Sequence, residues 1–232
     1  MFHNAWFSKS IVFRGTLMKK QVVLLLLCLS MGLLPVQGQS FSSDSIATGD
    51  LLFLDLDCGA LCSAIEAVTP HYKGVAFSHV GLLIRKTNGQ LLVIEATGDS
   101  VQCNPLEQVL HRSPHPAYVG QLRRQWKPLA AAAVAFAERQ IGQPYDGAFL
   151  LNNGKYYCSE LVYEAFKWAN HNHPVFRLFP MTYKEPGESA YFPAWVRYFN
   201  SIHQAIPEGK PGCNPGSIAV SGKLRLSPLD VR

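Results

Sequence analysis

Cys158 and His79 are the two residues whose types and surroundings predict covalent chemistry. Cys158 follows a loop and precedes apolar residues of 161–169 that recur at helical spacing, so a helix is expected to begin at or just before it. The positive end of that helix favours a thiolate, which is a strong nucleophile when a base stands beside it. His79 is the candidate base because it heads an apolar strand, whereas the other histidines lie in the leader, in loops or near prolines.

A predicted β-hairpin brings a third group, Glu95, close to His79. The dipeptide Asn88-Gly89 favours a tight turn between the strand that begins at His79 and the strand that contains Glu95. Pairing about this turn places the two residues within reach of a hydrogen bond. A carboxylate on one ring nitrogen fixes the tautomer and stabilises the imidazolium partner of a thiolate. Asp99 is the alternative for this orienting role.

Two segments resemble the signature of NlpC/p60-type cysteine hydrolases, which are small papain-like enzymes. They are Gly142-Gln143-Pro144-Tyr145-Asp146 and Tyr157-Cys158-Ser159-Glu160-Leu161-Val162. In the usual members the cysteine precedes the histidine, whereas here the strand with Ser78-His79-Val80-Gly81 comes first. That order resembles the circularly permuted branch, the YiiX/YebB-like group, and the opening strand Gly49-Asp50-Leu51-Leu52 also fits it. The resemblance covers roughly residues 48 to 226.

The resemblance implies a fold and an activity. The expected fold is α+β and papain-like, with a helix that presents Cys158 against a small, mostly antiparallel, barrel-like sheet flanked by helices. The expected activity is that of a secreted amidase or peptidase with a Cys-His-Glu triad, acting on cell-wall peptides or related small amides without a metal or cofactor. One alternative is a lipid-directed acyltransferase or thioesterase, although the chain lacks the Asn-Cys-Glu-His pattern of that branch. The other is a non-catalytic binding module.

Further residues are candidates for an oxyanion site or a substrate pocket. The backbone N–H of Cys158 would supply one oxyanion donor. Two acids, Asp50 and Asp146, either position loops or bind a substrate amine. The segment 171–193, rich in Pro, Phe and Tyr, is expected to be a packed loop over the site. For the aromatic candidates, simple packing is the alternative. The candidates are Tyr157, Asp50, Tyr145, Met181 and Tyr183.

The cysteine count supports an unpaired nucleophile. After removal of the leader five cysteines remain, and an odd number in an exported protein leaves at least one thiol free, which we assign to Cys158. The other four allow up to two disulfides, and the sequence does not rank their pairings. Zinc at Cys58-x-x-x-Cys62 is disfavoured because no close histidine pair completes a tetrahedral set. The four are Cys58, Cys62, Cys103 and Cys213.

The first 38 residues predict export, and their charge accounts for most of the net charge of +5. Residues 18–38 read as a signal peptide with cleavage near Gly38-Gln39, and the sequence leaves open whether Met18 is the true start. Four basic and no acidic residues precede residue 39, so residues 39–232 carry 17 basic and 16 acidic residues. This balance gives no argument for a nucleic-acid partner. We expect residues 39–232 to form one papain-like domain without a transmembrane segment.

The remaining periodicity predicts a small sheet and several helices. The predicted strands are 51–56, 79–85, 90–96 and 117–122. The predicted helices are a short one within 58–68, a turn at 105–111, and longer ones at 129–141 and 158–170. A short final helix is expected to begin after Asn214-Pro215, with 223–226 as a tail.

Overall fold

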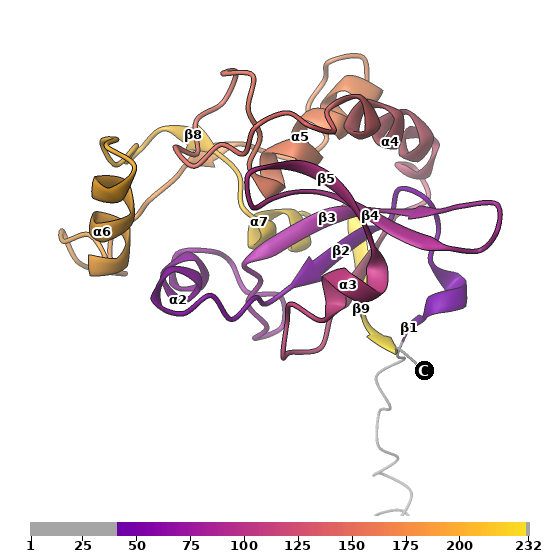
Figure 1. The fold of residues 1–232 in the computed structure, drawn as a ribbon, viewed down its shortest axis with the longest axis horizontal. Coiled ribbons are helices and arrows are strands. Elements are labelled where there is room, and N and C mark those ends of the chain that lie inside the picture. The colour runs from indigo at the N-terminus through magenta and orange to yellow at the C-terminus, as the bar shows by residue number, and fades with distance from the viewer. Residues whose placement is uncertain (1–40, 231–232) are drawn as a thin grey trace, which may run out of the picture. The chain divides into compact units, whose positions relative to one another are not determined.

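A sheet with the strand order β1-β9-β6-β2-β3-β4-β5 forms the centre of the computed structural model, which describes residues 41–230 (Figure 1). Neighbouring strands are antiparallel except for β1 and β9. The combination of helices with a mostly antiparallel sheet confirms the α+β prediction. The sheet is open, with β1 and β5 at its edges, so it does not close into a barrel. The strands are β1 Phe41–Ser42, β2 Leu51–Leu54, β3 His79–Arg85, β4 Leu91–Thr97, β5 Ser100–Pro105, β6 Tyr118–Leu122 and β9 Leu224–Asp230.

Helices cover both faces of this sheet. In Figure 1, α4 and α5 lie together on one side and α3 on the other, while α2 and α6 pack against each other at the left-hand end. A second sheet of two short strands, β7 (Phe179–Pro180) and β8 (Pro211–Gly212), lies outside the main one. The helices are α2 Ala60–Ala67, α3 Leu106–Leu110, α4 Ala130–Arg139, α5 Cys158–Ala169, α6 Pro193–Ser201 and α7 Pro215–Ala219, with 3-10 turns η1 Ser43–Ser45 and η2 Lys127–Leu129.

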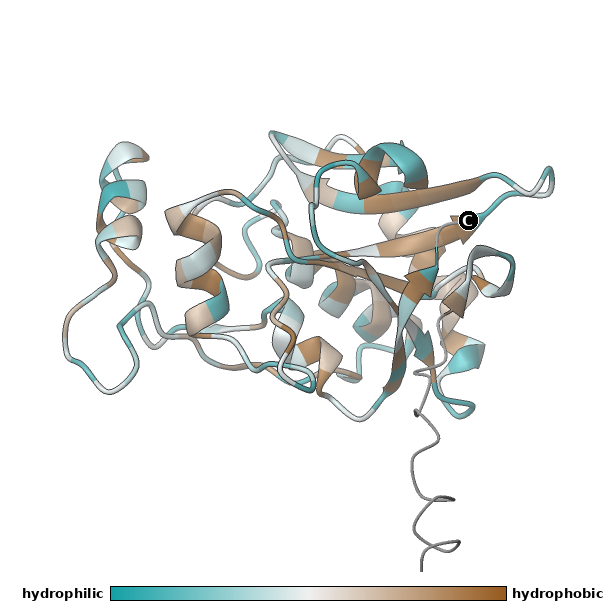
Figure 2. Cartoon of the chain, turned by 90° about the horizontal axis from the view of Figure 1, so that it is seen from below, coloured by the Kyte–Doolittle hydropathy of each residue, from teal (hydrophilic) through white to brown (hydrophobic). Residues whose placement is uncertain are grey.

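Alternation along the central strands divides the core into two layers. Successive side chains of a strand point to opposite faces, so Ile94 packs on the α5 side and Val93 on the α3 side. Leu82 and Leu83 of β3 divide in the same way. Both faces are therefore buried, and the strands appear strongly apolar in Figure 2.

Most predicted elements agree with the structure, including the short helices α2, α3 and α7, whereas β5, β9 and α6 were not predicted. Helices α4 and α5 and strands β3, β4 and β6 lie within about a residue or two of their predicted bounds. Strand β5 was missed because polar residues and a terminal proline occupy an edge strand, where such residues are tolerated. The predicted tail is strand β9, and the segment after 192 contains α6, with Pro193 in its first turn.

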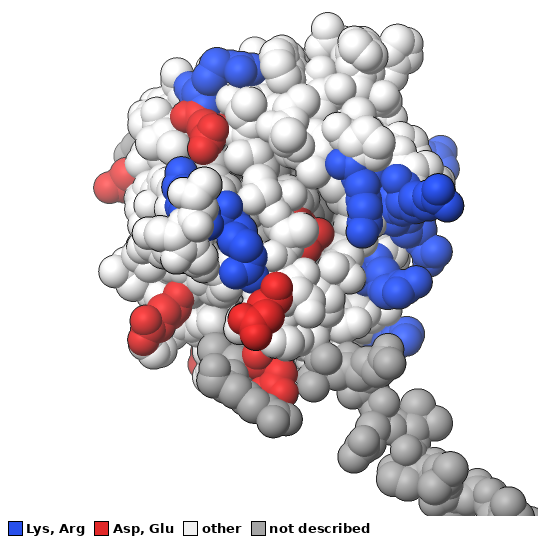
Figure 3. All heavy atoms as spheres, turned by 90° about the vertical axis from the view of Figure 1, so that its right-hand side faces the viewer, with Lys and Arg blue, Asp and Glu red and all other residues white. Residues whose placement is uncertain are grey.

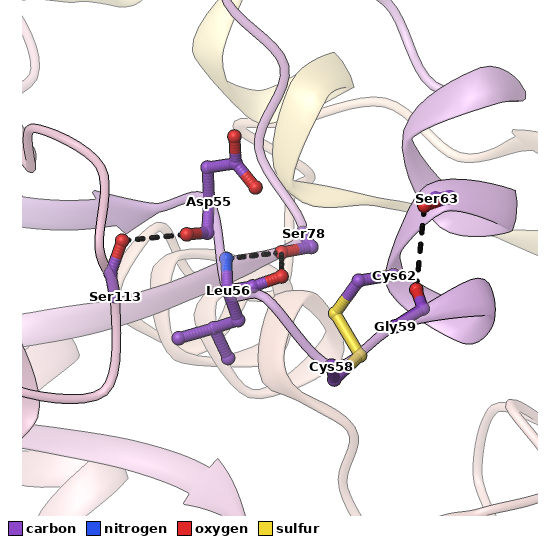
Figure 4. Close-up of a disulfide and its surroundings, with 8 residues drawn as sticks. All are labelled: Asp55, Leu56, Cys58, Gly59, Cys62, Ser63, Ser78 and Ser113. Carbon is purple, nitrogen blue, oxygen red and sulfur yellow. Dashed lines mark hydrogen bonds between the residues drawn. A yellow bond between two sulfur atoms is a disulfide. The ribbon is translucent and has the colours of Figure 1, made fainter.

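One disulfide, between Cys58 and Cys62, closes the turn that leads into α2 (Figure 4). Zinc is thereby excluded at this pair, since the two sulfur atoms are bonded to each other. Cys103, Cys158 and Cys213 are free thiols, so the second disulfide that the sequence allowed is not formed among residues 41–230.

Charged side chains of both signs occupy the surface. On the face drawn in Figure 3, basic side chains gather along the right-hand flank, whereas acidic and basic ones lie beside each other on the left. The predicted signal peptide and its cleavage site lie outside the described residues. Within residues 41–230, each helix is too short or too polar to cross a bilayer.

Gly81 tests how tightly the hairpin is packed. It lies opposite Glu95, one residue beyond the Leu82–Ile94 pair of strands β3 and β4. A Cβ atom there would stand 2.6 Å from Val93 Cγ1 and 3.2 Å from Glu95 Cβ. Gly81→Ala should therefore lower the free energy of unfolding, measured by urea denaturation, by about 1–3 kcal/mol. Thr87→Ala, at the exposed turn of the same hairpin, is the control. Equal stability of the two variants would contradict this packing.

Candidate active site

Cys158 is the first residue of α5, as the sequence predicted. The preceding Tyr157 is extended, and its backbone N–H donates to the Glu160 carboxylate at 3.5 Å, which is half of a capping box. Glu160 is buried, and its burial together with the nearby charge of Asp146 raises its pKa to about 8. The helix then buries Leu161 and the apolar residues that follow against the sheet. This packing fixes the position of the Cys158 sulfur.

His79 and Glu95 form a buried hydrogen-bonded pair. His79 Nε2 lies 2.6 Å from Glu95 Oε2, and the two residues are 5% and 0% exposed. The ionised carboxylate only accepts hydrogen bonds, so Nε2 carries the proton of this contact. The other ring nitrogen, Nδ1, is then left for the thiol.

Cys158 completes the cluster as the neighbour that acts most strongly to raise the pKa of His79. Burial by itself would lower the pKa of His79. The hydrogen bonds to Cys158 and Glu95 and the charges of both outweigh that effect and raise the pKa of His79 to about 9. His79 is therefore protonated at neutral pH, beside the Cys158 thiol.

Two residues that sequence reasoning missed, Arg112 and Asn104, hold Glu95 from its other side. Arg112 Nη2 lies 2.5 Å from Oε1 and 2.6 Å from Oε2, and Asn104 Nδ2 donates to Oε1 at 3.0 Å. Burial would raise the pKa of Glu95, but the His79 hydrogen bond and charge, followed by those of Arg112, lower it to about 2. Arg112 lies in a histidine- and proline-rich loop, and Asn104 in the strand that was not predicted, so neither carried a periodic signal.

A cavity of about 300 Å³ opens beside the Cys158 sulfur. Most of its lining is apolar or aromatic, and Phe179, Pro180 and Trp195 form part of the wall. The first two belong to the segment 171–193, which thus packs over the site. Four of the five pocket candidates line the cavity: Tyr145, Tyr157, Met181 and Tyr183.

The structure separates the fifth candidate, Asp50, from this cavity. Asp50 precedes β2, and it is the other end of that strand, Leu54, that pairs with His79. Its carboxylate accepts from the Ala47 N–H at 2.8 Å, and burial raises its pKa. Of the two roles left open for Asp50, positioning a loop is the one its contacts fulfil.

Asp146 and Tyr157 also make local contacts. Asp146 accepts from the backbone N–H groups of Ala148 and Leu150 at 3.0 and 2.6 Å, so it shapes the loop before α5. The Tyr157 hydroxyl accepts from the Cys213 N–H at 3.2 Å. Its ring lines the cavity, while its hydroxyl links α5 to the segment that leads into α7.

Most of the chain is similar to known proteins. Residues 45–226 match the family model of permuted papain-like amidase enzymes, YaeF/YiiX, C92. The uncharacterized protein YiiX of Escherichia coli K12 is 30% identical over 128 residues, which are 53% of this chain and 58% of that protein. The crystal structure of metalloprotein yiiX from E. coli O157:H7 superposes with a TM-score of 0.64 at 22% identity, covering 80% of this chain and 98% of that one. The latter likeness shows a shared fold.

The description of that relative as a metalloprotein raises the question of a metal site in this chain. Among residues 41–230, no group of three or more His, Cys, Asp or Glu side chains is arranged to hold an ion. Both Glu95 oxygens already face the Arg112 guanidinium, whose positive charge disfavours a second cation. The residues of this cluster therefore do not fit a metal centre.

The shifted pKa values make folding stability depend on pH. The pKa of His79 is raised above 6.5, so its contribution is complete below pH 6.5 and is lost as the pH rises through about 9. The pKa of Glu95 is lowered below 4.5, so its contribution is complete above pH 4.5 and is lost as the pH falls through about 2. Both contributions are therefore complete between pH 4.5 and pH 6.5, and the pair stabilises the fold most in that range.

A titration of His79 by NMR tests the contact with Cys158. We expect a midpoint near 9 for the wild type. Cys158→Ala should lower this midpoint, because it removes a hydrogen-bonding and negatively charged neighbour of the imidazolium. His79→Gln identifies the resonance. An unchanged midpoint in Cys158→Ala would show that the thiol does not act on the ring.

Proposed function

Since the chain belongs to the family of permuted papain-like amidase enzymes, we propose that Cys158, His79 and Glu95 form its catalytic triad. The observation that carries this proposal is the position of the imidazole. His79 donates to Glu95 through Nε2, and Cys158, the neighbour that raises the pKa of the imidazole most, lines the cavity. Thiol-dependent acyl transfer requires a nucleophile next to a base, and a carboxylate that orients the base from its other side.

The proposed reaction follows from these contacts. The Cys158 thiolate attacks the carbonyl carbon of an amide and forms a C–S bond, and the Cys158 backbone N–H stabilises the oxyanion. The His79 imidazolium gives its proton to the leaving nitrogen, the C–N bond breaks, and an amine departs. His79 then removes a proton from water, the resulting hydroxide attacks the thioester, and the C–S bond breaks. The products are an amine and a carboxylic acid, with the thiolate–imidazolium pair restored.

We propose that the substrates are cell-wall peptides or related small amides met outside the cytoplasm. The signal peptide predicted at 18–38 supports export. The Cys58–Cys62 disulfide also supports it, because such bonds persist mainly in oxidising compartments. A cavity of about 300 Å³ is at the small end of ligand sites, so it accommodates a short substrate segment next to the sulfur.

A second candidate function is hydrolysis or transfer of an acyl chain from an ester or thioester. The observation that favours it is the apolar lining of the cavity, which includes Phe149, Met181 and Trp195. The same thiolate and imidazole would serve this reaction. Mass spectrometry of ligands that co-purify with the protein separates the two candidates, because a fatty acyl chain supports the second and a small peptide or amino acid the first.

Replacement of the nucleophile tests the proposed triad. Cys158→Ala should reduce the hydrolysis of peptidoglycan-derived peptides at least about 10³-fold, because no other group forms the thioester. Chromatography of the released fragments measures the rate, and circular dichroism checks the fold. Cys103→Ala, at an exposed free thiol on β5, is the matched control and should keep wild-type activity. Hydrolysis that survives in Cys158→Ala would remove this residue from the mechanism.

A further inference from the structure

We propose that Arg112 is a positioning residue, which holds Glu95 behind His79 and thereby extends the activity of the Cys158 thiol to lower pH. The proposal rests on the triad proposed above. It concerns a residue outside both sequence motifs that carry the family resemblance.

The contacts of Glu95 define the role of Arg112. One guanidinium nitrogen, Nη2, lies within 2.6 Å of both carboxylate oxygens, and the other, Nη1, donates to Thr97 Oγ1 at 3.0 Å. The Oε2 atom that Arg112 contacts is the same atom that accepts from His79. Arg112 therefore holds the Glu95 carboxylate in the orientation in which Oε2 faces the imidazole.

Arg112 is itself held in place by the backbone around it. Its N–H donates to Val109 O at 3.2 Å, in the turn that ends α3. The next residue, Ser113, donates through its hydroxyl to Asp55 O at 2.6 Å, so the loop is fixed to the chain just beyond β2 (Figure 4). Glu95 shares with Val93 the face of the sheet on which α3 packs. The guanidinium thus reaches the triad from the side opposite α5.

Charge explains why Glu95 needs a second cation. The carboxylate is 0% exposed, and a buried carboxylate without compensation takes up a proton. The groups around it are His79 from β3, Arg112 beyond α3 and Asn104 from β5, with Cys158 beyond the imidazole. Only His79 and Arg112 among these bring positive charge, and the charge of His79 depends on pH. Arg112 is the permanent cation.

Loss of Arg112 should therefore move the acid limit of the reaction. Without the guanidinium, Glu95 would be protonated at a higher pH, and a neutral Glu95 no longer stabilises the imidazolium that accompanies the thiolate. Arg112 is absent from the residues that line the cavity, so substrate binding should change little. This combination distinguishes positioning from a general loss of structure.

The experiment compares Arg112→Gln and Arg112→Lys with Arg124→Gln, an exposed arginine, in full-length protein that carries Cys103→Ser. The rate at which iodoacetamide alkylates Cys158 is measured between pH 3 and 9, together with kcat and KM for hydrolysis. Arg112→Gln should move the acid limb of alkylation upward by about one pH unit and lower kcat more than KM changes. Arg112→Lys keeps the charge, so it should shift the acid limb by no more than about half as much as Arg112→Gln. Arg124→Gln should match the parent.

An acid limb that stays in place in folded Arg112→Gln would overturn the proposal. If Arg112→Gln does not fold by circular dichroism, Thr97→Val replaces it, because that variant loses the hydroxyl that holds Nη1. An unshifted limb in folded Thr97→Val would then overturn the proposal. Failure of the proposed function is a different result, in which the parent itself shows neither hydrolysis nor preferential alkylation of Cys158.

Discussion

The hydrogen bond of 2.6 Å between His79 and Glu95 is the interaction on which the rest of the site depends. Burying two ionisable groups is costly unless they are paired and all their polar atoms are satisfied. The structure meets this requirement from three elements, because β3 carries His79, β5 carries Asn104 and the turn after α3 carries Arg112. Gly81 leaves room opposite Glu95 for the carboxylate to turn toward the imidazole. Much of the local packing can thus be understood as the support of one buried ion pair.

The Cys158 sulfur lies between this charged cluster and an apolar cavity. Cys158 is 8% exposed, with the imidazole on one side and the cavity on the other. The walls of the cavity come from α2, from α6 and from the segment that contains β7. The disulfide lies at the start of α2, so it stabilises one of these walls. The chain belongs to a family of papain-like amidase enzymes, and selectivity in the proposed reaction would arise from the shape of the cavity.

The elements that could be predicted from the sequence are those with strong local patterns. The apolar period after Cys158 placed α5, and the Asn88-Gly89 turn placed His79 near Glu95, because hairpin register follows from the turn. The same patterns contain no information about Arg112, which reaches Glu95 through a tertiary contact from an irregular loop. The sequence left open that Asp50 lines the pocket. The strand pairing shows that it lies at the end of β2 opposite to Leu54, which pairs with His79.

A competition between two thiols in one molecule tests the central claim most directly. Iodoacetamide is added below stoichiometry at pH 6, and peptide mass spectrometry measures its distribution between Cys158 and the exposed Cys103. If the buried imidazolium holds Cys158 as a thiolate, Cys158 will be alkylated first in spite of its low exposure. Preferential alkylation of Cys103 would mean that accessibility alone governs reactivity, and it would contradict the thiolate–imidazolium pair.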